Sequence, residues 1–485
     1  MTIISLLAEK IWKSGGTPFL GEHRTDCSVE MQTGRNREGH RKKGSAFGLL
    51  LALSLSFVAA VTGAEPAAGV YRIGPTRSHR TIQEIEGLLV PGDLVLVDGD
   101  QRYDGGITFS QAGKADRPIT IRGEKMNGKR PLIAGGRNGV DFSRSHYVFE
   151  GFEIVDVAGR GLNHRADDIT IRDCVVHACT NGIMSSDHGS GSLTVENCEV
   201  YDCGGGDADH QLYIATDEEA CPRAVFRLQF CYIHDGRGGN NVKSRAERNN
   251  IYSNWISNAF YHNLDLVGAD PASGVPADRA REDSDVVGNV LIAARNGRNV
   301  RIGGDGTGQS NGRYRFLNNT FIHRSNKPES QIHARFGVES VEMHNNVFSP
   351  GSGAVFEDAR AEWVGGVRRV SGAANWVHRS ARGVPAQWVR TIAGVDAGFS
   401  GLKADRLRPV ADSPLIGAGV RTTASPPDAP FPNPLAAAVH HPPEARLQTV
   451  GTAEVRADLA GPAIGAFALH WRTAEESPRD GSLRK

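Results

Sequence analysis

The stretch "DCVVHACTNGIMSSDHGSGSLTVENCEVYDC", residues 173–203, contains one short pattern twice. The pattern begins at Asp173 and again at Asn197: a polar residue, a cysteine and a short segment rich in valine. Five later segments align with it: "FCYIHDG" from Phe230, "SNWISNA" from Ser253, "GNVLIAA" from Gly288, "NNTFIHR" from Asn318 and "NNVFSPG" from Asn345. Across all seven segments the second positions, Cys or Asn, are spaced by 24, 33, 23, 35, 30 and 27 residues. A repeat of this length predicts a solenoid.

The repeated segments have the composition of strands. They are short, β-branched and bounded by Gly, Asn and Asp, and the stretches between them carry no sustained helical period. We therefore predict an all-β solenoid, a parallel β-helix, over residues 65–420 and continuous over residues 81–360. "GFEIVDV", with Phe152 at the second position, extends the series upstream.

Stacking of the turns explains the repeated asparagines and cysteines. Like residues in successive turns lie about 4.8 Å apart, so asparagine side chains can form a hydrogen-bonded column. We expect Asn254, Asn289, Asn319 and Asn346 to form one internal column. The pairs Cys174/Cys198 and Cys179/Cys203 are each 24 residues apart and fall in neighbouring turns, and Cys221 lies near Cys231. Disulfides and stacked free thiols are both compatible with this spacing.

The N-terminal region has the features of a secretory signal. "RKKGSAFGLLLALSLSFVAAVTGAEP", residues 41–66, has a basic start, an apolar run and a small-residue site for cleavage after Ala64. Met31 is the more plausible initiator. Residues 1–64 are therefore interpreted as a signal region, and we expect a periplasmic or secreted bacterial protein that no longer contacts the membrane after cleavage.

The charge of the remaining chain does not favour nucleic acid as a partner. Residues 1–64 carry eight basic and five acidic residues, which leaves 47 Lys and Arg against 50 Asp and Glu. A slightly negative balance gives no basic footprint for a phosphate backbone. We expect a monomer.

A second strand follows each turn, and its alternation predicts an exposed polar face. The inward column is Ile183, Leu212, Val242, Leu264, Val300 and Ile332. The next residue of each strand points outward, in the column Met184, Tyr213, Lys243, Asp265, Arg301 and His333, and Arg245 and Arg335 face the same side. Neighbouring amides suited to sugar hydroxyls are Gln211, Asn241, Asn263, Asn299 and Gln331.

This face suits an extended acidic polysaccharide, because it combines cations with hydrogen-bonding groups over several turns. The alternative is an ordinary solvated surface with a Lys243–Asp265 ion pair.

The chain resembles the pectin-lyase-like superfamily of right-handed parallel β-helices. The resemblance rests on "TIQEIEGLLVPGDLVLVDGDQRYDGGITFSQAGKADRPITIRGE", residues 81–124, and on the closing segments "DSPLIGAGV" and "DLAGPAIGAFAL". It covers about residues 70–469 and implies a single-stranded right-handed coil. This scaffold hosts lyases, hydrolases, epimerases and binding proteins.

A local stretch is similar to the chondroitinase B and alginate lyase family. "NNVKSRAERNNIYSN", residues 240–254, resembles that family's Lys-Ser strand, which implies that Lys243 is the base that removes the proton α to a uronate carboxylate. The family's arginine maps onto Asp265, and an arginine returns one turn later as Arg301. The acidic residues that hold the family's calcium ion are replaced by Gly236, Arg237 and Gly238.

Under this hypothesis Lys243 is the base, and Arg301 and Arg245 neutralise the carboxylate. Tyr213 and His262 are both candidates for the acid that protonates the leaving oxygen. Asp265, His333 and Arg335, with the amides Gln211, Asn241, Asn263 and Asn299, are candidate substrate-binding residues.

Two other functions remain open from the sequence. A glycoside hydrolase would use two carboxylates, for which Asp187, Asp207, Asp209 and Asp265 are available. A non-catalytic carbohydrate-binding or envelope protein would use the same face without turnover. Asp207 and Asp209, in "GGGDADHQ", could instead form a calcium-binding turn.

The C-terminal part lacks the repeat. Residues 421–470 include the proline-rich "SPPDAPFPNPLAAAVHHPPEA" and are expected to wrap the last turn or to form a linker. Residues 471–485 are expected to be a disordered tail.

Overall fold

The computed structural model describes residues 67–270, 281–293, 297–306, 308–324, 329–349, 353–432, 436–458 and 461–469. All of them belong to one compact unit, residues 61–485. The predicted signal region, 1–64, and the predicted tail, 471–485, lie outside the described residues.

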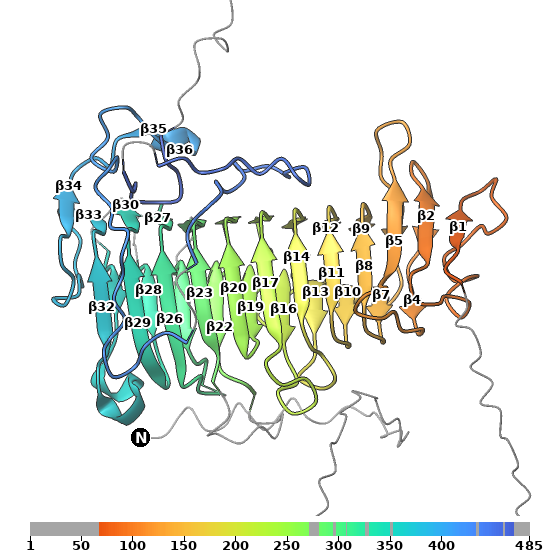
Figure 1. Ribbon diagram of the computed structural model, residues 1–485, viewed down its shortest axis with the longest axis horizontal. Helices are drawn as coiled ribbons and strands as arrows, with labels where there is room; N and C mark the ends of the chain where they lie inside the picture. Colours follow the sequence, from red (N-terminus) through yellow and green to blue (C-terminus); the bar gives the residue numbers. More distant parts are fainter. Residues whose placement is uncertain are drawn as a thin grey trace, which may run out of the picture. The chain divides into compact units, whose positions relative to one another are not determined.

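Three parallel sheets, here called A, B and C, form this unit (Figure 1). Sheet A contains β1 (Val70–Ile73), β2 (Leu94–Asp98), β5 (Ile119–Glu124), β8 (Tyr147–Glu150), β11 (Ile169–Arg172), β14 (Leu193–Glu196), β17 (Val225–Gln229), β20 (Arg248–Tyr252), β23 (Asp283–Val287), β26 (Gly312–Leu317), β29 (Val338–His344) and β32 (Val370–Ala373). Sheet B contains β3 (Arg102–Asp104), β6 (Leu132–Ala134), β9 (Glu153–Val155), β12 (Val175–His177), β15 (Glu199–Tyr201), β18 (Tyr232–His234), β21 (Trp255–Ser257), β24 (Val290–Ala293), β27 (Thr320–His323), β30 (Val347–Ser349), β33 (Trp376–His378) and β34 (Ile392–Gly394). Sheet C contains β4 (Ile107–Phe109), β7 (Asn138–Phe142), β10 (Arg160–His164), β13 (Asn181–Ser185), β16 (Leu212–Ala215), β19 (Val242–Arg245), β22 (Leu264–Val267), β25 (Val300–Gly303), β28 (Ile332–Ala334) and β31 (Phe356–Glu357).

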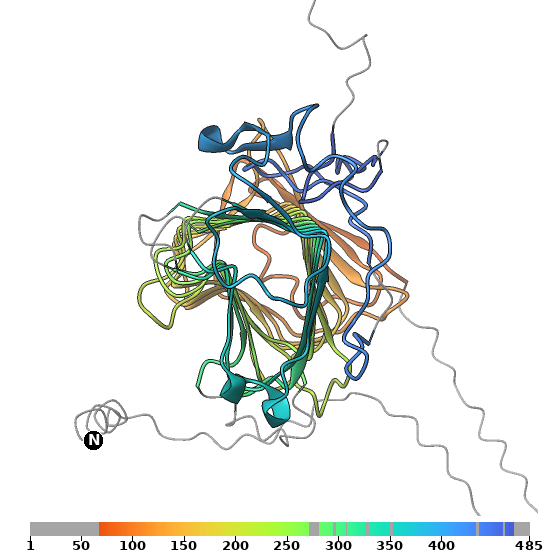
Figure 2. The ribbon, with the colours of Figure 1, turned by 90° about the vertical axis from the view of Figure 1, so that its left-hand side faces the viewer.

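Each turn of the chain adds one strand to each sheet. β17, β18 and β19, for example, belong to sheets A, B and C and pair with β20, β21 and β22 of the next turn. The view along the coil shows these turns superposed (Figure 2). The fold is a single-stranded right-handed parallel β-helix, and the predicted fold class is confirmed.

The corner between sheets A and B explains the repeated sequence pattern. One residue with positive φ makes each corner: Asp173, Asn197, Phe230, Ser253, Gly288, Asn318, Asn345 and Ala374. Asn, Asp and Gly adopt this conformation at least cost, which accounts for most of these residues. The residue that follows the corner points into the core.

The residue after each corner forms the predicted internal column. Asn254 Nδ2 donates to Asn289 Oδ1 at 2.9 Å, Asn289 donates to Asn319 at 3.0 Å, and Asn319 donates to Asn346 at 3.0 Å. The column continues from Asn346 to Asn375. All of these asparagines are fully buried, so the prediction is confirmed.

Cysteines continue this column toward the N-terminus as free thiols. Cys174, Cys198 and Cys231 are fully buried, and the backbone N–H of Cys231 donates to Asn254 Oδ1 at 2.9 Å. Cys179 and Cys203 are also free thiols. Of the two arrangements that the spacing left open, the structure has stacked free thiols, and neither the two pairs 24 residues apart nor Cys221 and Cys231 form a disulfide.

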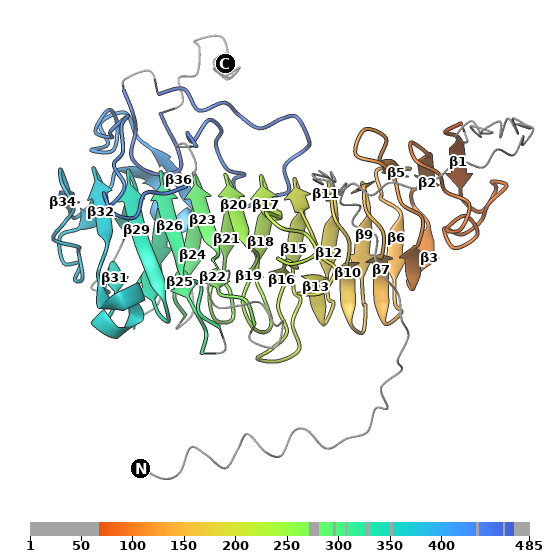
Figure 3. The same ribbon diagram turned by 60° about the horizontal axis from the view of Figure 1, so that its bottom comes forward.

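The C-terminal segment lies back along the outside of the coil rather than on the last turn alone (Figures 1 and 3). Gln448 accepts a hydrogen bond from Asn197 at the β14 corner, and the His440 carbonyl accepts one from Ser253 at the β20 corner. Phe431 lies between the guanidinium groups of Arg248 and Arg315 on sheet A. This segment packs over the corners and outer faces of sheets A and B, and sheet C lies on another side.

Short elements complete the described structure. β35 (Phe399–Gly401) pairs antiparallel with β36 (Arg406–Pro409), and the 3-10 helix η5 (Leu402–Ala404) joins them. Two further 3-10 helices, η3 (Arg360–Glu362) and η4 (Val364–Gly366), follow β31 of sheet C. Among the described residues no helix is both long and apolar enough to cross a membrane.

Candidate functional site

The outward column of sheet C has the predicted register. Met184 pairs with Tyr213, Tyr213 with Lys243, Lys243 with Asp265, Asp265 with Arg301, and Arg301 with His333. The inward partners Leu212, Val242, Leu264 and Val300 are fully buried. Alternation along the strands β16, β19, β22 and β25 (labelled in Figure 3) therefore presents these polar residues on the outer side of sheet C.

A cleft of about 520 Å³ lies over the middle of this column. Five predicted site residues line it: Tyr213, Lys243, Arg245, His262 and Arg301. Asp207, considered for a metal ion, also lines it. The cleft has further walls that the sequence analysis did not single out: Ala208, His210, Asn240, Tyr261, Asp270 and Asp305.

One carboxylate joins the two cations on β19. Asp305 Oδ2 lies 2.7 Å from Lys243 Nζ and 2.6 Å from Arg245 Nη2. The Lys243 side chain is 13% exposed and that of Arg245 is 3% exposed, so both ion pairs are largely removed from bulk water. The Lys243–Asp265 ion pair of the alternative interpretation is therefore not formed, because Lys243 pairs with Asp305 and Asp265 pairs with Arg301.

Tyr213 is held in the centre of the cationic group. Its hydroxyl oxygen accepts a hydrogen bond from Arg245 Nε at 3.1 Å, and Lys243 Nζ lies 5.1 Å from the centre of its ring. The ring of His210 meets the Tyr213 ring edge-on at 5.2 Å. Arg245 also donates to the Gly268 carbonyl, which orients its guanidinium toward Tyr213.

The two cleft histidines are neutral near pH 7. Burial, assisted by the nearby Lys243 charge, lowers the pKa of His210 to about 4. Burial also lowers the pKa of His262 to about 4, against the opposing charge of Asp265. His210 Nδ1 accepts a hydrogen bond from the Asn240 backbone N–H at 2.9 Å, so the proton of its neutral ring is on Nε2.

Asp265 is a buried partner of Arg301 rather than an exposed binding residue. Arg301 Nε and Nη2 lie 2.6 and 2.7 Å from the two Asp265 oxygens, and Asn240 Nδ2 donates to the same carboxylate at 2.8 Å. The Asp265 side chain is 0% exposed. Its predicted substrate-binding role is corrected: this carboxylate is fully occupied in orienting Arg301 and Asn240.

The four predicted binding amides are also in the core. Gln211 donates to Asn241, Asn241 to Asn263, Asn263 to Asn299, and Asn299 to Gln331, with distances of 2.8, 3.0, 2.7 and 2.6 Å. Gln211, Asn241, Asn263 and Asn299 are 0% exposed, so the prediction that they face the substrate is wrong. Each residue precedes a strand of sheet C at the corner, where strand alternation does not apply and two successive side chains point inward.

His333 and Arg335 do not line the cleft. His333 follows Arg301 in the column, and burial, with the Arg298 charge, lowers its pKa to about 4. Arg335 is 41% exposed and lies 4.0 Å from Glu362. These residues extend the polar face toward the C-terminal turns.

Asp207 and Asp209, the residues considered for calcium, contact different partners. Asp207 lies near Tyr261 and raises the pKa of its hydroxyl, whereas Asp209 accepts a hydrogen bond from Asn181 at 3.3 Å. No group of three or more His, Cys, Asp or Glu side chains within the described ranges could hold a metal ion. The expected calcium-binding turn is therefore not supported. Asp187 and Asp209, considered for a hydrolase, do not line the cleft.

Asp305 is the most important residue that the sequence analysis missed. It lies just after β25, in "GGDGTG", residues 303–308, outside the strand positions at which the repeats align. The sequence did contain a signal for Asp305. It is a carboxylate flanked by glycines, directly after a strand of the polar face. His210 and Asn240 could have been found as the residues that precede this face at the corner.

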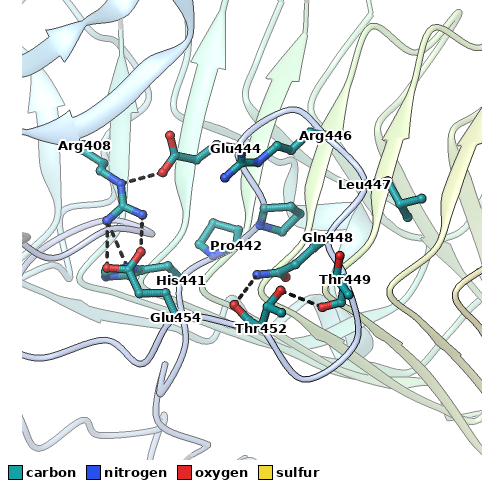
Figure 4. A pocket seen from close by; sticks show the side chains of 11 residues that line it. Arg408, His441, Pro442, Glu444, Arg446, Leu447, Gln448, Thr449, Thr452 and Glu454 are labelled. Atoms are coloured by element: carbon teal, nitrogen blue, oxygen red, sulfur yellow. Dashed lines mark hydrogen bonds and ion pairs between the residues drawn. The ribbon is translucent and has the colours of Figure 1, made fainter. Parts of the chain in front are cut away.

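A second cavity, of about 360 Å³, lies within the C-terminal segment (Figure 4). Arg408 on β36 reaches Glu444 at 2.6 Å, Glu454 at 2.5 Å and His441 at 3.1 Å. These contacts occupy the guanidinium group and tie β36 to residues 441–454. The cluster therefore fastens the C-terminal segment and is not the candidate active site.

Comparisons with known proteins identify the fold. The chain matches no protein-family model and no curated protein. Among solved structures it is similar to the pectate lyase Pel9A, with 12% identity, a TM-score of 0.50, and coverage of 83% of this chain and 97% of that one. A PL6 family polysaccharide lyase from Pseudopedobacter saltans has 11% identity, a TM-score of 0.46, and coverage of 68% and 95%. The GH136 lacto-N-biosidase of Eubacterium ramulus has 12% identity, a TM-score of 0.38, and coverage of 67% and 68%.

The chain thus has the pectin-lyase-like parallel β-helix fold. At 12% identity the likeness to the pectate lyase establishes the fold alone. The function has to be argued from the cleft on sheet C.

Proposed function

We propose that this protein is an exported lyase that cleaves an acidic, uronate-containing polysaccharide by β-elimination. The observation that carries the proposal is the convergence of Lys243, Arg245, Arg301 and Tyr213 on one cleft of sheet C. β-Elimination needs a base, cations that neutralise the carboxylate and an acid for the leaving oxygen. The cleft contains one group or more for each requirement.

In this mechanism the neutral amine of Lys243 takes the proton from the carbon α to the uronate carboxylate. The released electron pair forms the new carbon–carbon double bond, and the bond to the glycosidic oxygen breaks. Arg245 and Arg301 stabilise the charge that develops on the carboxylate.

Tyr213 is the better candidate for the acid. Its hydroxyl oxygen accepts from Arg245 Nε at 3.1 Å, which leaves its own proton available and places a cation beside the oxygen that would become negative. His262 is less suitable, because burial lowers its pKa to about 4 and its buried Nδ1 has no hydrogen-bond partner. A neutral imidazole is a poor proton donor near pH 7.

The test is turnover on a panel of uronate polysaccharides, measured by the ultraviolet absorbance of unsaturated sugar ends. Lys243→Ala is expected to lower turnover by about 10²-fold or more, the lower range for a positioned acid or base. The thermal midpoint should change little, because Asp305 keeps its pair with Arg245. Tyr213→Phe is expected to lower turnover by a similar factor. Lys125→Ala, which changes an exposed lysine outside the cleft, is the matched control.

Full activity of Lys243→Ala would contradict the lysine-base mechanism. The cleft carboxylates Asp207, Asp270 and Asp305 would then become candidates for a glycoside hydrolase, which needs a pair of carboxylates. Binding of every polymer without turnover would favour a non-catalytic carbohydrate-binding protein.

A further inference from the structure

Two groups that the proposed lyase would use, the base Lys243 and the cation Arg245, already contact a carboxylate. A single oxygen of Asp305 lies 2.7 Å from Lys243 Nζ and 2.6 Å from Arg245 Nη2. The Asp305 side chain is 9% exposed. A uronate presents the same chemical group, so the substrate and Asp305 cannot both use these donors in the same way.

The backbone around Asp305 allows this residue to move away from Lys243 and Arg245. β25 ends at Gly303, which has a φ of 99°, and Gly306 has a φ of 95°, so glycines with unrestricted torsions stand on both sides of Asp305. Gly304 forms an isolated antiparallel bridge with Gln309, which makes Asp305 part of a short turn. A side-chain atom added at Gly306 would meet nothing within 4 Å, so there is open space beside this turn.

The carboxylate of Asp265 differs from that of Asp305 in its place in the fold, its exposure and its partners. Asp265 is on the strand β22, is 0% exposed, and is held by both Arg301 nitrogens and by Asn240. Because β22 is paired on both sides, the Asp265 backbone cannot move without disturbing the sheet. Asp265 is therefore part of the scaffold, whereas Asp305 is the carboxylate that can be exchanged.

We infer that Asp305 occupies the position of the substrate carboxylate and is displaced by it, which makes Asp305 a specificity-determining residue for charged sugars. This inference rests on the proposed function. Exchange of one carboxylate for another leaves Arg245 paired throughout, whereas a neutral sugar that displaced Asp305 would leave this buried cation unpaired. An unpaired buried charge is strongly unfavourable. The cleft therefore admits uronates and rejects neutral hexoses at this position.

The test is binding of free glucuronate and of glucose, measured by isothermal titration calorimetry at low ionic strength with the full chain. Asp305→Asn removes the competing charge with little change of shape, and it is expected to bind glucuronate at least about tenfold more tightly than the wild type, a gain of about 1.4 kcal/mol. Its affinity for glucose should not change. Asp305→Ser is the second variant, and the circular dichroism spectrum and thermal midpoint check that each variant is folded.

Asp207→Asn is the matched control, because it removes the same charge from the same cleft but from a residue that lies near Tyr261. It should bind glucuronate within about twofold of the wild type. Equal gains in both variants would overturn the inference, since they would reflect net charge alone. Unchanged, weaker or undetectable glucuronate binding by folded Asp305 variants would overturn it as well.

The assay involves no turnover, so it separates this inference from the proposed function. A gain in glucuronate affinity without any lyase activity would leave a uronate-binding protein. Lyase activity that depends on Lys243, without a gain in the Asp305 variants, would leave the proposed function and remove the role of Asp305.

Discussion

Neighbouring residues of sheet C have different roles because of their contacts. Lys243 and Asp265 are adjacent in the outward column, but only Lys243 lines the cleft. Asp265 is covered by Arg301 and Asn240, which consume its hydrogen-bonding capacity. Strand alternation predicts on which side of the sheet a residue lies, but the length and partners of its neighbours decide whether it reaches solvent.

Neutralising Asp265 is therefore expected to destabilise the fold. Asp265→Asn leaves the Arg301 guanidinium, 21% exposed, without its carboxylate, and should lower the free energy of unfolding by about 3 kcal/mol. Urea denaturation measures this change. The matched control, Asp116→Asn, alters an exposed aspartate and should change the free energy by less than about 0.5 kcal/mol. A similar small effect at Asp265 would show that the pair with Arg301 contributes no net stability.

Among the structural elements, the asparagine column joins the turns of the coil. Asn289 accepts from the backbone and side chain of Asn254, and it donates to the Ile251 carbonyl and to Asn319. Each side chain thus satisfies backbone groups at the corner as well as linking two turns. Such groups, once buried, are costly to leave without partners.

Removing one amide should cost more than removing one thiol from the same column. Asn289→Ala leaves the Asn254 N–H and the Ile251 carbonyl without partners, so the free energy of unfolding should fall by at least about 2 kcal/mol. Cys198→Ala, the comparison variant, removes a weak hydrogen-bonding group from an equally buried site and should cost less. Chemical denaturation of both variants checks the order. Equal costs would mean that volume, rather than hydrogen bonding, determines the contribution of this column.

Over the whole molecule, buried ionisable groups determine how stability depends on pH. Burial lowers the pKa to about 4 for five histidines: His164, His210, His262, His333 and His441. In the unfolded chain these groups bind protons near pH 6.5. Stability should therefore fall as the pH falls from about 6.5 to 4, because the unfolded state takes up more protons in this range.

Four buried or half-buried glutamates with raised pKa values, Glu86, Glu218, Glu247 and Glu282, act in the opposite direction. Burial raises the pKa of Glu218 to about 8 and that of Glu282 well above its ordinary value. The folded protein retains these protons above pH 4.3, where the unfolded chain loses them, so each contribution to stability decreases as the pH rises through the folded pKa. The histidines are more numerous, so their effect dominates below about pH 6.5.

We predict that the thermal midpoint is highest near pH 6.5 and decreases on both sides. Differential scanning calorimetry between about pH 4.5 and 9 measures the profile. His164→Leu removes one fully buried histidine and should make the decrease toward acid pH shallower, whereas His188→Leu, at an exposed position, should leave it unchanged. A midpoint independent of pH below 6.5 would contradict the role of the buried histidines.

The sequence alone was sufficient to predict the repeat, the parallel β-helix, the internal asparagine column and the register that brings Tyr213, Lys243 and Arg301 to one face. These features depend on periodicity and on strand alternation, which are local properties of the chain. The tertiary structure alone decided the partners of the charged groups and the path of the C-terminal segment. Lys243 meets Asp305 across 62 residues, and Asn197 meets Gln448 across 251. Such contacts depend on how segments outside the repeat fold back onto the coil. A periodic pattern in the sequence does not predict that packing.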